Sequence, residues 1–92
     1  MDKFDMKNLI SRGSPFSVPS SKFDKFDLKE LIVCSIENNN CMTILDEGNF
    51  DKFDLKELFS YGAKIQMNPK WDTFDMQEFI DSAKEAGGTV IV

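Results

Sequence analysis

The chain has 92 residues, of which 41% are hydrophobic and 29% charged, and its net charge at pH 7 is −5. This composition is typical of a small globular protein, and we expect a single domain over residues 1–92. The apolar runs are too short for a transmembrane helix and no secretion signal is evident, so we expect a cytoplasmic protein. The acidic balance argues against nucleic acid or an anionic membrane as a direct partner.

One pattern recurs four times along the chain. The pattern has ten positions: an aromatic residue, Asp, any residue, Phe and Asp, then Leu/Met, Lys/Gln, any residue, Leu/Phe and an apolar residue. In the first copy, Met1 takes the aromatic position. The copies span residues 1–10, 23–32, 50–59 and 71–80. Four occurrences in so short a chain indicate internal repetition. The repeats run approximately over residues 1–22, 23–49, 50–70 and 71–92.

Each copy reads as the start of a helix. We expect the second Asp to be the N-cap and the first to be a turn former or solvated. A glutamate three positions after the second Asp would complete a capping box in three copies, and Asn8 replaces it in the first. The preceding Phe would then form a hydrophobic staple with the residue five positions on, in the pairs Phe4–Leu9, Phe26–Leu31, Phe53–Leu58 and Phe74–Phe79.

A breaker and a short β-like run follow each predicted helix. The helices are expected over residues 5–12, 27–38, 54–62 and 75–86. The strands are expected at Phe16–Val18, Cys41–Leu45, Lys64–Met67 and Thr89–Val92. Pro15 and Pro19 flank the first strand and mark it as irregular or at a sheet edge. The Pro/Ser-rich segment Ser14–Lys22 is interpreted as a mobile loop or an irregular joint.

Alternation of helices and strands predicts an α/β fold. Strands joined through a helix are usually parallel, so the repeats favour a short solenoid with a parallel sheet on one side and helices on the other. Each repeat would supply its Phe and its Leu/Ile pair to a continuous core. This shape is similar to that of a leucine-rich repeat, although the strand signature of that family is missing. The alternative is a compact two-layer α/β sandwich with shuffled strand order.

The residue types argue against catalysis and metal binding. Histidine is absent, and no nucleophile elbow, phosphate-binding loop or dinucleotide fingerprint is present. Capping explains the repeated Asp pairs better than calcium, which would need a different ligand spacing. Cys34 and Cys41 lack the spacing of a zinc site, and we expect them to be reduced and structural. We therefore expect no enzyme activity, no metal and no cofactor.

Departures from the repeat are candidates for partner binding. Asp46 and Glu47 form an acidic loop that should share one edge of the fold with Asp24, Asp51 and Asp72. This edge is interpreted as an acidic binding surface or, because lysines are interleaved with it, as a solvated edge. Aromatic anchors could come from Phe59, Tyr61 and Trp71, although the position of Trp71 in the repeat also suits core packing.

The final segment is a second candidate. Val90, Ile91 and Val92 form an apolar strand, and an open strand edge readily pairs with another chain. The partner would be an identical subunit, giving a homodimer, or a different protein by β-augmentation. The alternative is that Val92 lies inside the sheet beside an earlier strand.

These features favour a non-enzymatic protein–protein binding module. In size, acidity and lack of a catalytic site, the chain is similar to small inhibitor proteins of phages and mobile elements, such as anti-CRISPR and anti-restriction proteins. That resemblance implies that it would occlude a basic nucleic-acid-binding surface on a target protein. The alternatives are an immunity or antitoxin protein and a self-assembling structural adaptor that pairs through its C-terminal strand.

Overall fold

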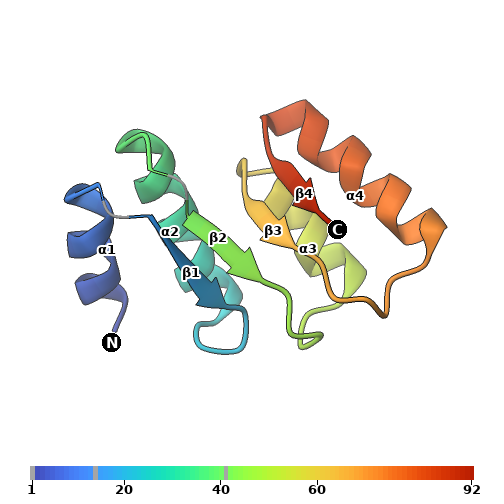
Figure 1. The fold of residues 1–92 in the computed structure, drawn as a ribbon, viewed down its shortest axis with the longest axis horizontal. Coiled ribbons are helices and arrows are strands. Elements are labelled where there is room, and N and C mark those ends of the chain that lie inside the picture. Colours follow the sequence, from blue (N-terminus) through green and yellow to red (C-terminus); the bar gives the residue numbers. More distant parts are fainter. Residues whose placement is uncertain (1, 14, 41) are drawn as a thin grey trace.

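A computed structural model describes residues 2–13, 15–40 and 42–92 of the chain. Helices and strands alternate along the chain (Figure 1). The helices are α1 (Lys3–Ser11), α2 (Lys25–Glu37), α3 (Lys52–Phe59) and α4 (Thr73–Ala86). The strands are β1 (Phe16–Pro19), β2 (Met42–Leu45), β3 (Lys64–Gln66) and β4 (Thr89–Ile91).

The four strands form one parallel sheet in the order β1-β2-β3-β4. Val18, Ile44, Ile65 and Val90 stand opposite one another across the sheet and face the helices. The helices complete the core with residues spaced three and four apart, such as Leu28, Leu31 and Ile32 of α2. The predicted α/β class, parallel sheet and two-layer arrangement are confirmed, and the strand order follows the chain rather than being shuffled.

All four helices begin at the first Asp of the repeat and not at the second. Asp2, Asp24, Asp51 and Asp72 are the N-caps, and each accepts a hydrogen bond from the backbone N–H three residues later. The prediction that Asp5, Asp27, Asp54 and Asp75 cap the helices is therefore wrong. Those residues lie within the first turn, where their charge complements the helix dipole.

This shift also overturns the predicted staple. The Phe of each repeat lies inside the helix, and Phe4, Phe26, Phe53 and Phe74 are exposed rather than packed in the core. The aromatic residue before the N-cap packs against the core instead, as Phe23, Phe50 and Trp71 do. The Trp71 ring meets the Phe79 ring edge-on at 5.1 Å. The expectation that Trp71 packs in the core is confirmed.

The segment from Pro15 to Lys22 is held at the sheet edge. It contains β1, whose outer side has no partner strand in the described part of the chain. Ser20, which follows β1, is buried and accepts a hydrogen bond from the backbone N–H of Glu47 at 2.9 Å. Ser14 and Cys41, which fall within predicted elements, lie outside the described residues. Among the helices described, none is long and apolar enough to cross a membrane.

Candidate functional site

Four phenylalanines stand at equivalent positions on the four helices and face solvent. We call Phe4, Phe26, Phe53 and Phe74 the phenylalanine row. Their side chains are 68–79% exposed. Because the strands are parallel, all four helices start at the same edge of the molecule (Figure 1). Each Phe of the row is the second residue of its helix and therefore belongs to that edge.

Helix geometry explains why these rings point outward. Phe26 is the second helical residue of α2, two positions before the buried Leu28. At about 100° per residue, the two side chains point about 160° apart around the helix axis. The same offset separates Phe53 from the buried Leu55 on α3. A Phe at this position cannot reach the core once the helix includes it.

Lysine side chains lie against three of the rings. The Nζ atoms of Lys3 and Lys7 lie 5.5 and 6.0 Å from the centroid of the Phe4 ring. The corresponding distances to Phe26 are 5.8 Å from Lys25 and 5.2 Å from Lys29, and Lys52 lies 6.0 Å from Phe53. These are cation–π distances. On α4, Thr73 and Gln77 take the lysine positions, and no cation lies over Phe74 among the described residues.

The same lysines join each helix to the next through an ion-pair ladder. Each helix from α1 to α3 uses two lysines to reach an aspartate and a glutamate on the following helix. Lys25 Nζ, for example, lies 2.9 Å from Asp54 and 2.9 Å from Glu57, and Lys29 lies 2.5 Å from Glu57. The equivalent groups are Lys3 and Lys7 with Asp27 and Glu30, and Lys52 and Lys56 with Asp75 and Glu78. The glutamates expected in capping boxes therefore pair with lysines.

These contacts shift the pKa values of the groups in the ladder. The hydrogen bond from Lys29, and then that from Lys25, holds the pKa of Glu57 below its ordinary value. Hydrogen bonds from Lys7 and Lys52, foremost among their lysine contacts, lower the pKa of Glu30 and Glu78 in the same way. Each glutamate of the ladder is thus held in its charged form.

The ladder leaves a row of uncompensated aspartates beside the rings. The ladder pairs six lysines with six carboxylates. Outside the ladder and the helix starts, the chain has five basic and five acidic residues. We call the five aspartates that remain at the helix starts the aspartate row. It comprises Asp2, Asp5, Asp24, Asp51 and Asp72, all exposed and without an ion pair in the described part of the chain.

Asp24, Asp51 and Asp72 were expected at an acidic surface, and they lie at this edge as N-caps. In each of the three, Oδ1 accepts from the backbone N–H three residues on at 2.8 Å. The second oxygen, Oδ2, has no protein hydrogen bond among the described residues. These carboxylates are therefore held in one orientation by the helix and present a free acceptor to solvent.

Of the two loop carboxylates expected at this surface, Asp46 is buried, whereas Glu47 is exposed. Asp46 is 7% exposed and accepts from Trp71 Nε1 at 2.6 Å and from the backbone N–H groups of Asn68 and Gly48. Glu47 accepts from the backbone N–H of Ser21 at 3.2 Å and from its hydroxyl, and these bonds lower the pKa of Glu47. Both carboxylates fasten loops to one another.

The C-terminal strand is an edge of the sheet. β4 pairs with β3 on one side and has no strand on its other side among the described residues. Val90 packs against the core and Ile91 is half-buried, while Val92 lies beyond the strand and is 98% exposed. The alternative that Val92 lies within the sheet is therefore not what the structure shows.

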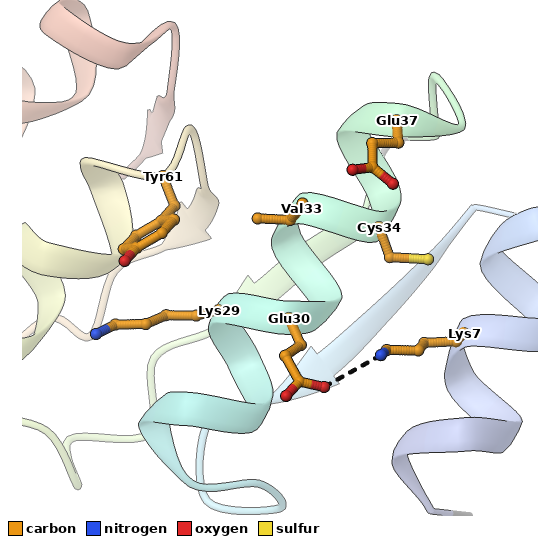
Figure 2. Close-up of a pocket in the computed structure, with 7 residues that line it drawn as sticks. All are labelled: Lys7, Lys29, Glu30, Val33, Cys34, Glu37 and Tyr61. Carbon is orange, nitrogen blue, oxygen red and sulfur yellow. Dashed lines mark hydrogen bonds and ion pairs between the residues drawn. The ribbon is translucent and has the colours of Figure 1, made fainter.

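A shallow groove of about 410 Å³ runs over α2 between Lys7 of α1 and Tyr61 (Figure 2), near the phenylalanine row. Lys29 connects the two, because its Nζ lies 5.3 Å from the Tyr61 ring centroid as well as against Phe26. Of the predicted aromatic anchors, Tyr61 is 43% exposed, whereas Phe59 is fully buried. The groove is lined by Lys7, Lys29, Glu30, Val33, Cys34, Glu37 and Tyr61.

The described residues contain no group of three or more His, Cys, Asp or Glu side chains placed to hold a metal ion. The chain matches no family model. It shows no significant similarity to a curated protein or to a solved structure.

Proposed function

We propose that this protein is a non-enzymatic protein–protein binding module that contacts its partner through the phenylalanine row. The observation that carries the proposal is that four Phe side chains at one edge are each 68–79% exposed. Single exposed apolar residues are common, but an aligned set on one edge is typical of an interaction surface. The repeat places the same ring in every helix, where a polar residue would serve the fold equally well.

The energetics favour a contact that uses several rings at once. Burying one Phe side chain contributes about 1.5–3 kcal/mol. Association costs on the order of 4–15 kcal/mol in lost translational and rotational freedom. One ring cannot offset that cost, whereas three or four rings together with polar contacts can. The partner surface should therefore span several helices.

An occluding inhibitor is a narrower form of the same proposal. The aspartate row gives the edge a negative charge that would suit a basic nucleic-acid-binding surface on a target protein. An immunity or antitoxin protein would use the same chemistry against a single toxin. Self-assembly through β4 belongs to a different class, and the open outer side of that strand supports it.

We also interpret the fold as a short solenoid. Consecutive repeats supply consecutive strands, and adjacent helices contact one another in chain order. Parallel strands lie about 4.8 Å apart while packed helices need about 8–10 Å, so such a stack curves with its helices on the outer side. This curvature would spread the phenylalanine row over a convex edge.

Capture of binding partners with matched variants tests the proposed function. Tagged wild-type protein is compared with F26S/F53S/F74S and with I36S/I80S, which removes two exposed apolar residues away from the row. Bound proteins are identified by mass spectrometry at low and high salt. We expect one specific partner that the row variant loses and the control retains. Equal capture of the partner by the row variant would contradict the proposal. If sedimentation velocity showed only self-association, and the row variant self-associated equally well, the self-assembling adaptor would be favoured.

A further inference from the structure

The phenylalanine row and the aspartate row together define the chemistry of the side chains that would cover them. Each ring lies two positions after its N-cap aspartate, in the same helical turn. Every helix start therefore carries one exposed ring and one fixed carboxylate. An aliphatic partner alone would leave the carboxylates unpaired, and a purely polar partner would leave the rings in water.

The rings already show what they accept. Lysines of the protein itself lie over Phe4, Phe26 and Phe53 at 5.2–6.0 Å. Those lysines also form the ion pairs of the ladder with the following helix. On α4 the lysine positions hold Thr73 and Gln77, so the Phe74 ring is without a cation among the described residues. Phe74 is also the most exposed ring of the row.

Asp72 is the N-cap of the same helix and supplies a carboxylate there. Its Oδ1 accepts from the backbone N–H of Asp75 at 2.8 Å, which leaves Oδ2 for another donor. A guanidinium group can stack on an aromatic face and donate to a carboxylate at the same time, which an ammonium group does less well. An arginine side chain therefore suits the uncovered Phe74 ring, and the free carboxylate oxygens at the helix starts suit further basic side chains.

We infer that the helix-start edge binds a basic amphipathic segment of the partner protein, with an arginine on the Phe74 ring, basic side chains paired with the aspartate row and aliphatic residues against the other rings. This inference rests on the proposed function and names the chemistry of its partner. Charge complementarity carries it, because the carboxylates of the aspartate row are exposed and have no ion pair among the described residues. A second copy of this chain would bring two such rows together and be repelled.

The test uses a fluorescein-labelled synthetic helical peptide of roughly three heptads with arginine and leucine on one face. A counterpart carries glutamate in place of each arginine. The binding of both peptides to the full chain is followed by fluorescence anisotropy at increasing salt. We expect only the arginine peptide to bind, with an affinity that falls as salt rises.

Three variants separate local contacts from net charge. D24N/D51N/D72N removes three charges and keeps the helices capped, since Asn is as good an N-cap as Asp. E37Q/D81N/E85Q removes three exposed charges elsewhere. We expect the first variant to lose about tenfold in affinity and the second less than about twofold. F74S should weaken binding more than F4S, because Phe4 is already covered by two lysines.

Equal losses in the two charge variants would overturn the inference, because only net charge would then matter. Unchanged binding of the arginine peptide by F74S would overturn it too. So would a wild-type dimer that the F26S/F53S/F74S variant cannot form, since the row would then be covered by a second copy of the chain. If a captured partner depends on the phenylalanine row but neither competes with the arginine peptide nor responds to D24N/D51N/D72N, the proposed function stands and this inference fails.

Discussion

The Oδ1 atom of Asp24 accepts a hydrogen bond from the backbone N–H of Asp27 at 2.8 Å. The bond closes the first turn of α2, so that Phe26, one of the two residues between them, is helical and points away from the buried Leu28. The same contact recurs at the start of the other helices. A local capping bond in each repeat thereby sets the direction of every ring in the phenylalanine row.

The first prediction concerns this cap. Replacing Asp51 with Ala should lower the free energy of unfolding by about 0.5–2 kcal/mol, because the N–H of Asp54 loses its acceptor. Asp51→Asn should be close to neutral. Urea denaturation followed by circular dichroism measures both. If Asp54→Ala destabilised the protein more than Asp51→Ala, the assignment of the cap to Asp51 would fail.

A second prediction separates exposed rings from buried ones. Phe53→Ala should change the free energy of unfolding by less than about 0.5 kcal/mol, because its ring is in solvent. Phe59→Ala, six residues further along the chain, should cost about 3–5 kcal/mol, because its ring is fully buried and contacts that of Phe79. Urea unfolding of the two variants side by side makes the comparison. Similar losses in both would mean that Phe53 is packed.

Periodicity and breakers were enough to predict the α/β class, the number of helices and strands and their order. They did not predict the position of the N-cap, because Asp-x-x-Asp and Asp-x-x-Glu both satisfy a capping pattern. One signal pointed to the correct choice. The first Asp is present in all four copies, whereas Asn8 replaces the glutamate in the first copy. A cap shifted by three residues then moved the Phe from a predicted staple to the surface.

Other features of the site depend on contacts between distant residues. Asp46 reads as part of an acidic loop, yet it accepts from Trp71 Nε1, 25 residues away, and is buried. No local pattern reveals that partner. The ion-pair ladder could have been found by comparing the repeats, because two positions that hold lysine in the first three repeats hold Thr73 and Gln77 in the fourth. The first helix, which receives no lysines from an earlier repeat in this chain, has Asn8 in place of glutamate.

The third prediction concerns the loss of stability at acidic pH. The lysines lower the pKa of Glu30, Glu57 and Glu78 in the folded state, so these groups stabilise the fold while the pH is above their ordinary value of 4.5. That contribution should be lost as the pH falls from about 5 through the lowered folded-state values. Measuring the free energy of unfolding between pH 7 and pH 3 tests this.

The triple variant E30Q/E57Q/E78Q is the control for the pH dependence of stability. It should be less stable than wild type at pH 7, should depend less on pH, and should approach wild type at pH 3. High salt should narrow the difference at pH 7, because these pairs are at the surface. A variant whose pH profile parallels that of wild type would show that the ladder glutamates do not control the acid response.

The fourth prediction concerns the bond between Asp46 and Trp71. Asp46→Ala should lower the free energy of unfolding by about 1–3 kcal/mol, because the indole N–H and two backbone N–H groups lose their acceptor in a partly buried place. Trp71 is the single tryptophan of the chain, so its fluorescence reports directly on this site. Its emission maximum should shift as its surroundings change.

Glu47→Ala is the matched control for Asp46→Ala. It removes a neighbouring carboxylate that is exposed and bonded to Ser21 rather than to the indole. Its emission spectrum should match that of wild type, and its stability should change by less than about 0.5 kcal/mol. Should both variants shift the emission equally, Trp71 would be reporting a general loosening of the loop. A shift confined to Asp46→Ala would establish that this buried carboxylate orients the indole against Phe79.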